Sequence, residues 1–147
     1  DLQRNAPRGH LDPRALAAYT RHLLDLIGSG LFAFIAHPDG FGMFYDTWDA
    51  ETEAAARDIA QAARDAQVPL EINAYGLRKP TIPTPAGARP AYPWTPFWDT
   101  VASCGAPAIV NSDAHRPEDI DGKVPEALAL AARAGVRLTD LRLQTAG

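Results

Sequence analysis

Three short apolar segments alternate along this chain with segments of helical periodicity, and this alternation restricts its fold more than any other feature. The apolar segments run from Leu31 to Ala36, from Val68 to Asn73 and from Ala106 to Asn111, and Val136 to Leu138 is a brief fourth candidate. Continuous apolar runs of this length are typical of parallel strands that are buried on both faces. The chain is therefore predicted to be an α/β protein with a parallel sheet or barrel.

The segments between these strands carry helix signals. Asp12 and Pro13 form an N-cap with proline in the first turn, and apolar residues then recur at spacings of three and four until Gly28. Further helices are predicted over 52–66, 94–103 and 117–134, although Gly122 and Pro125 leave the start of the last one open. Residues 74–93 are rich in proline and are predicted to form a long loop.

The composition describes one soluble domain of 147 residues with 46% hydrophobic and 22% charged residues. A net charge of −4 gives no basic footprint for nucleic acid or for an anionic membrane. No apolar run is long enough to span a bilayer, and the polar start of the chain is unlike a signal peptide, so a cytoplasmic location is expected. The single Cys104 excludes an internal disulfide.

Two histidines directly follow predicted strands, where α/β proteins bind their ligands. His37 lies in the string His-Pro-Asp, and His115 lies in Ser-Asp-Ala-His together with Asp113. Imidazole and carboxylate groups at neighbouring strand ends can bind one metal ion, which suits hydrolysis by an activated water. Two alternatives remain open from these residues, because Ser112 or Asp113 could cap the following turn and His115 could be solvated.

The loop after the second predicted strand carries the pair Arg78-Lys79. A guanidinium group can bind a phosphate through two hydrogen bonds, but such a pair can also be a solvated basic patch. Within the strand, Glu71 and Asn73 alternate with apolar residues and must share one face. Glu71 is interpreted as a buried structural acid bonded to backbone groups.

Other candidate residues have weaker signals. His22 lies within the first predicted helix and suits a surface or packing role, and His10 is unassigned. Two aromatic clusters could line a substrate pocket or pack the long loops onto the sheet. No glycine-rich nucleotide loop and no serine-hydrolase elbow is present. The clusters comprise Phe41, Phe44, Tyr45 and Trp48, and then Tyr92, Trp94, Phe97 and Trp98.

Several strings, taken in order and with their spacing, resemble the C-terminal half of a histidinol-phosphatase of the polymerase and histidinol phosphatase (PHP) superfamily. The similarity covers about residues 16–135. The strings are Ser29-Gly30-Leu31-Phe32 with Ala36-His37-Pro38-Asp39, Leu70-Glu71-Ile72-Asn73 with Gly76-Leu77-Arg78-Lys79-Pro80, Tyr92-Pro93, and Asn111-Ser112-Asp113-Ala114-His115 with Pro117-Glu118-Asp119.

The resemblance implies a distorted (β/α)7 barrel that holds divalent metal ions at the carboxyl ends of its strands. It implies that His37, Asp113 and His115 are metal ligands, that Asp113 and His115 are catalytic, and that Arg78 binds the substrate phosphate. The metal would be zinc, manganese or iron. The implied activity is hydrolysis of a small phosphate monoester, with L-histidinol phosphate in histidine biosynthesis as the favoured substrate and another phosphate ester as the alternative.

The chain departs from the family at its N-terminal side. The family's first motif, His-x-Asp-x-His or His-x-His after a strand, is absent, and His10-Leu11-Asp12 does not match it because a helix follows. Residues 1–147 are therefore interpreted as one partial PHP domain. The expected partner is the N-terminal half of the same barrel, or a second copy of the chain, and the chain alone is expected to be nearly inactive. A non-catalytic half-barrel that binds metal or packs against a partner is the competing hypothesis.

Overall fold

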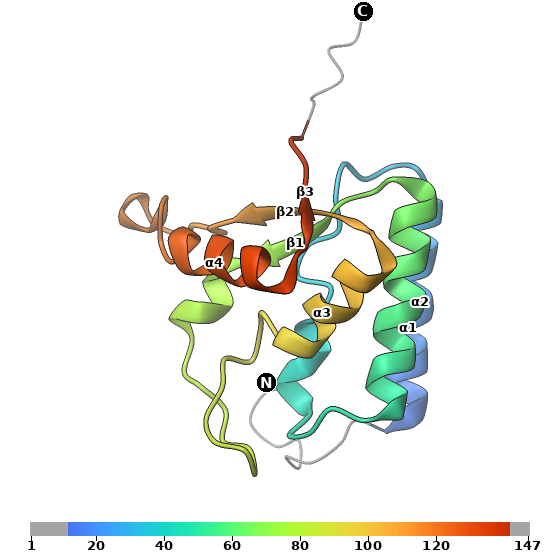
Figure 1. The fold of residues 1–147 in the computed structure, drawn as a ribbon, viewed down its shortest axis with the longest axis horizontal. Helices are drawn as coiled ribbons and strands as arrows, with labels where there is room; N and C mark the ends of the chain where they lie inside the picture. Colours follow the sequence, from blue (N-terminus) through green and yellow to red (C-terminus); the bar gives the residue numbers. More distant parts are fainter. Residues whose placement is uncertain (1–11, 142–147) are drawn as a thin grey trace, which may run out of the picture.

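The computed structural model describes residues 12–141 as a layer of helices on one small parallel sheet (Figure 1). The α/β class predicted from the sequence is confirmed. Three short 3-10 helices, η1 to η3, lie in the connections. In chain order the elements are α1 (Pro13–Gly28), η1 (Gly40–Phe44), α2 (Ala50–Ala66), β1 (Leu70–Asn73), η2 (Ala74–Arg78), α3 (Thr95–Cys104), β2 (Pro107–Asn111), η3 (Pro117–Asp119), α4 (Val124–Ala134) and β3 (Arg137–Leu138).

The sheet has the strand order β1-β2-β3, and both pairs are parallel. In the β1 and β2 pair, Leu70 lies opposite Ala108 and Asn73 lies opposite Asn111. β3 pairs only through Arg137 and Leu138. The carboxyl ends of β1 and β2 are therefore level with each other, and the loops that leave them start side by side.

The first apolar segment does not form the strand predicted over residues 31–36. Only Ile35 pairs with the sheet, where its N–H donates to the carbonyl oxygen of Pro69 and its own carbonyl oxygen accepts from Glu71 N, both at 2.9 Å. Leu31 and Phe32 keep 82% and 47% of their surface exposed. The expectation of a strand buried on both faces is wrong here, because within residues 12–141 only Ile35 pairs with the sheet and little packs over the side chains of Leu31 and Phe32.

Helix boundaries follow local capping. Asp12 accepts a hydrogen bond from Arg14 N, which confirms the predicted cap of α1. Asp49 and Thr52 form a capping box, so α2 starts two residues earlier than the pattern predicted. The helix expected over 117–134 is divided into η3 and α4, because Lys123 adopts a left-handed backbone (φ +62°) and Pro125 falls in the first turn of α4.

The core lies between the helices and one face of the sheet, and in Figure 1 the labelled helices lie on the same side of the strands. Leu70 and Ile72 of β1 are fully buried against helix residues such as Ile59. The aromatic clusters contribute to this core, since Phe41 is in edge contact with four other rings. The packing alternative therefore holds for most of these aromatic residues.

None of the helices within residues 12–141 has the length and the apolar content needed to cross a bilayer.

Candidate functional site

A buried polar network occupies the helix-free face of the sheet at the carboxyl ends of β1 and β2. Glu71 and Asn73 are 4% and 1% exposed, and Asn73 Nδ2 donates to Glu71 Oε2 at 3.1 Å. Asn111 Nδ2 donates to the other oxygen, Glu71 Oε1, at 3.0 Å. The shared face predicted for Glu71 and Asn73 is confirmed. The Glu71 carboxylate is desolvated, and these N–H donors compensate its charge.

The loop that carries His37 is attached to this network through its backbone. His37 N donates to Glu71 Oε2 at 3.0 Å, which confirms that Glu71 is a buried acid bonded to a backbone group. His37 itself has a left-handed backbone (φ +30°), a conformation that costs energy in a non-glycine residue. Its side chain is exposed at the surface, with the ring centroid 5.7 Å from that of Tyr92.

Asp113 is attached to the same network through its side chain. Asn73 Nδ2 donates to Asp113 Oδ2 at 3.0 Å, and the backbone of Asp113 is also left-handed (φ +49°). The turn-cap alternative for Ser112 and Asp113 is not seen, because the following helix, η3, has Arg116 at its N-cap and no side-chain cap bond. The loop after β2 is thus held so that a carboxylate oxygen contacts β1.

His115 lies over a tyrosine ring beside Asp113. Its Nδ1 is 2.9 Å from the carbonyl oxygen of Asp113, and its ring centroid is 4.4 Å from that of Tyr75. The imidazole is exposed, and Nε2 is left free of protein partners within the described residues. Asn73 Oδ1 accepts from Tyr75 N at 2.9 Å, so the same amide orients both Asp113 and the backbone of the residue under His115.

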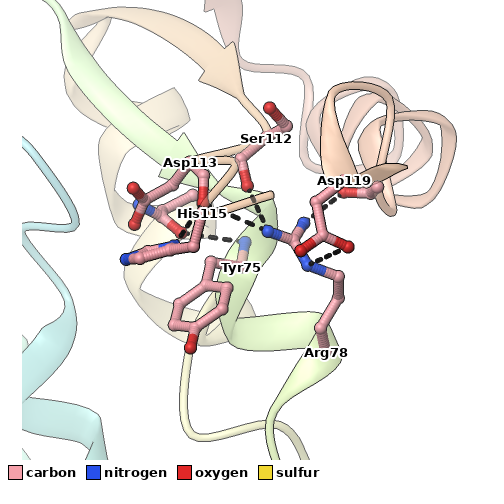
Figure 2. A network of polar contacts seen from close by, with 8 residues as sticks. Tyr75, Arg78, Ser112, Asp113, His115 and Asp119 are labelled. Carbon is pink, nitrogen blue, oxygen red and sulfur yellow. Dashed lines mark hydrogen bonds and ion pairs between the residues drawn. The ribbon is translucent and has the colours of Figure 1, made fainter. Parts of the chain in front are cut away.

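The Arg78 guanidinium contacts the backbone of two other segments (Figure 2). Nη1 donates to the carbonyl oxygen of Gly122, and Nη2 donates to those of Ser112 and Asp113 at 2.9 and 3.2 Å. Asp119 Oδ1 lies 3.8 Å from Nε. In this arrangement Arg78 joins η2 to the loop after β2. That Arg78 binds a substrate phosphate stays a prediction.

Lys79, the next residue, lies between two tyrosine rings. Its Nζ is 4.9 Å from the ring centroid of Tyr75 and 4.9 Å from that of Tyr92. Tyr75 contacts the ring of His115, and Tyr92 contacts the ring of His37. An unbroken series of ring and ammonium contacts therefore connects the two predicted metal-binding histidines.

Asp39, in the His-Pro-Asp string, faces the core and not the strand-end network. Its Oδ2 accepts from Trp94 N at 2.7 Å and from Trp98 Nε1 at 2.9 Å, and the side chain is fully buried. Burial raises the pKa of this carboxyl from 3.8 to about 6. Burial, with the charge of Asp39, also raises the pKa of Tyr19, whose hydroxyl donates to the Pro38 carbonyl.

The donor chemistry of this region fits a divalent metal, since His37, Asp113 and His115 offer imidazole and carboxylate groups. Within residues 12–141, however, no three His, Cys, Asp or Glu side chains are grouped closely enough to hold an ion. The two left-handed backbones at His37 and Asp113 are of the kind that persists at functional sites. Convergence of the three side chains on one metal stays a prediction.

The remaining candidates lie away from the network. His22 is exposed on α1, as expected from its position, and His10 lies outside the described residues. The surface also has two hollows, of about 410 and 310 Å³. The larger is lined by α1 and α2, and the smaller includes Ile109 and Leu138. Their linings contain no residue of the network except Asn111.

Sequence reasoning did not single out Tyr75. It named Asn111 only within the string that leads to His115, and Tyr92 only within an aromatic cluster, and it gave neither residue a contact with this network. A signal existed for Asn111, because it ends a strand at the same register as Asn73. The two tyrosines gave no such signal, because Tyr75 lies in the short 3-10 helix η2 and Tyr92 in the connection before α3, where no strand or helix periodicity places a ring.

A scan against protein-family models found no match for this chain, and a search of curated proteins found none.

Proposed function

We propose that this chain is the C-terminal part of a metal-dependent PHP phosphatase that hydrolyses a small phosphate monoester, with L-histidinol phosphate as the favoured substrate. Its parallel sheet would then belong to a distorted (β/α)7 barrel. One observation supports this most: the loops that carry His37 and Asp113 are both hydrogen-bonded to the buried Glu71 and Asn73 pair. Strand-end loops held this way suit a site beyond the carboxyl ends of a parallel sheet.

In this proposal His37, Asp113 and His115 are the metal ligands that this chain contributes. A bound divalent ion lowers the pKa of a water and polarises the phosphoryl oxygen. Asn73 orients Asp113 through Oδ2, which leaves Oδ1 for a ligand. The His115 Nδ1 contact with the Asp113 carbonyl fixes the ring and leaves Nε2 available. Asp113 and His115 are the residues proposed to act on the reacting water.

The test is metal analysis of the purified protein together with a screen of phosphate monoesters. Because the chain alone is expected to be nearly inactive, hydrolysis is measured after reassociation with the N-terminal half, and Asp113→Ala should abolish it there. In the chain alone, the same substitution should lower the metal content while the far-ultraviolet circular dichroism stays unchanged. Asp99→Ala, on an exposed position of α3, is the matched control and should change neither. Hydrolysis that survives Asp113→Ala would contradict the proposed role of this carboxylate.

The Arg78 prediction has its own test. If Arg78 binds the phosphate, Arg78→Lys should raise KM and weaken inhibition by inorganic phosphate, because lysine cannot form the two-point contact. Its three carbonyl contacts predict instead a loss of stability in the same variant. An unchanged KM and unchanged phosphate inhibition would remove Arg78 from the substrate site.

We also propose that a partner covers the exposed apolar residues beside the sheet. The partner would be the N-terminal half of the same barrel or a second copy of the chain. Support comes from the apolar side chains of Leu31, Phe32, Leu128 and Leu138, which are 43 to 82% exposed near the sheet's two edges. Edge strands and apolar surface of this kind require cover in a stable assembly.

Native mass spectrometry of the protein, before and after addition of an N-terminal half, tests this partner. Reassociation with a gain of phosphatase activity supports the proposal. A fully active monomer with no second fragment would refute it. Metal binding and reassociation without hydrolysis would favour the competing function, a non-catalytic half-barrel.

A further inference from the structure

The environment of Lys79 differs from that of an ordinary surface lysine. Its ammonium group lies at equal distance, 4.9 Å, from the ring centroids of Tyr75 and Tyr92. Those rings in turn contact His115 and His37, at 4.4 and 5.7 Å between centroids. The positive charge is therefore held between the two histidines that flank the strand-end network.

The backbone holds this arrangement in place. Gly76 lies in η2 directly against Tyr92, and a Cβ atom at this position would overlap the Tyr92 carbonyl oxygen. Only a glycine allows the two segments to approach this closely. Tyr75 N is bonded to Asn73, and Lys79 N donates to the Gly76 carbonyl at 3.3 Å. The two rings and the lysine between them are thus positioned by the same short segment.

The ammonium group lacks a protein acceptor of its own. Within residues 12–141, no carboxylate lies at ion-pairing distance from Lys79 Nζ, and no oxygen accepts a hydrogen bond from it. The tyrosine faces attract the charge but do not accept its three N–H donors in line. The neighbouring Arg78, in contrast, already donates to three carbonyls.

We propose that Lys79 binds the phosphate dianion of the substrate, with Tyr75 and Tyr92 as the walls that direct its ammonium group toward the space beside His37 and His115. This inference rests on the proposed function for the identity of the substrate. The ligand class is a phosphate group, either of a monoester or of inorganic phosphate, since a point charge with three donors suits a compact dianion. Lys79 would thus do what the sequence assigned to Arg78.

Two measurements on the full chain test this assignment. Inorganic phosphate is titrated into the protein by isothermal calorimetry, and p-nitrophenyl phosphate hydrolysis, measured after reassociation with the N-terminal half, gives KM and kcat. Lys79→Ala should weaken phosphate binding and raise KM by about tenfold or more, as expected for loss of a charged hydrogen bond. Lys79→Arg should restore part of the binding. Lys123→Ala, which removes an exposed lysine paired with Glu126, is the matched control and should change neither value.

The outcomes separate this inference from the proposed function. Hydrolysis with the same KM and the same phosphate affinity in Lys79→Ala would overturn the role of Lys79 and leave the phosphatase intact. Phosphate binding that depends on Lys79, without hydrolysis of any monoester even after reassociation with the N-terminal half, would overturn the phosphatase and leave the anion site. A chain that binds no phosphate at all would overturn the assignment of Lys79.

Discussion

The buried carboxylate of Asp39 should make the stability of the protein depend on pH in a direction opposite to that of most carboxylates. Its side chain has no solvent exposure, and its Oδ2 accepts from two tryptophan N–H groups while Oδ1 has no hydrogen-bond partner. Desolvation raises the pKa to about 6 even though these bonds and the nearby His37 favour the charged form. Between pH 3.8 and about pH 6, the folded protein therefore holds a proton on Asp39 that the unfolded chain has released.

The magnitude follows from linkage. A rise in pKa from 3.8 to about 6 corresponds to about 3 kcal/mol. The carboxyl is protonated in both states below pH 4, so its contribution is then complete. As pH rises from about 4 to about 6, the free energy of unfolding should fall by about 3 kcal/mol from this group alone, and it should stay at the lower value above pH 6.

Asp39→Asn isolates this effect. The amide oxygen can replace Oδ2 as acceptor for Trp94 N and Trp98 Nε1, and the amide nitrogen adds a cost that does not vary with pH. The free energy of unfolding of the variant, minus that of the wild type, should therefore increase by about 3 kcal/mol between pH 4 and pH 7.

Urea unfolding followed by tryptophan fluorescence measures this difference, because Trp94 and Trp98 are the residues that contact Asp39. Protein concentration must be fixed, since association would shift apparent stability. Asp99→Asn, at an exposed position of α3 next to Trp98, is the control, and its free energy of unfolding should change with pH in parallel with that of the wild type. Parallel pH profiles for Asp39→Asn and the wild type would refute the argument.

Two further substitutions test how the loops and helices are fixed. Gly76→Ala should lower the free energy of unfolding by about 1–3 kcal/mol, because the new Cβ would overlap the Tyr92 backbone. Gly28→Ala, at the end of α1, meets open space and should leave the free energy of unfolding unchanged or raise it slightly, and thermal unfolding distinguishes the two variants. Asp49→Ala removes the capping box of α2 and should cost about 1 kcal/mol, seen as a lower Tm; an unchanged Tm would show that Thr52 alone caps the helix.

The sequence predicted the features that depend on local patterns. Caps such as Asp12 bond to the backbone two or three residues away, so the residue types are sufficient to locate them. The alternation of Glu71 and Asn73 with Leu70 and Ile72 likewise assigned polar and apolar faces to β1, as the structure confirms. These predictions succeed because the interactions involved span few residues.

Features that depend on distant neighbours could not be predicted in the same way. The apolar run before His37 resembles a buried strand, yet within the described residues only Ile35 pairs with the sheet, and a local apolar pattern does not show how many residues will find a pairing partner. Asp39 belongs to the His-Pro-Asp string after a predicted strand, but its partners lie 55 and 59 residues away, at Trp94 before α3 and at Trp98 within α3. Arg78 similarly finds its acceptors 34 to 44 residues further along the chain.

The buried carboxylates of Glu71 and Asp39 differ in how completely their oxygens are hydrogen-bonded, and this gives them different structural roles. Glu71 is nearly as buried as Asp39, but both of its oxygens accept hydrogen bonds. Its donors are His37, in the loop after the Ile35 bridge, and Asn73 and Asn111, at the ends of β1 and β2. Removing this carboxylate would leave three donors unsatisfied and would release two loops together. Asp39, with one oxygen unpartnered, fixes a contact within the core. Glu71, with both oxygens bonded, fixes the positions of the loop and strand ends beyond the sheet. The second arrangement is the one that the proposed site at His37, Asp113 and Lys79 requires.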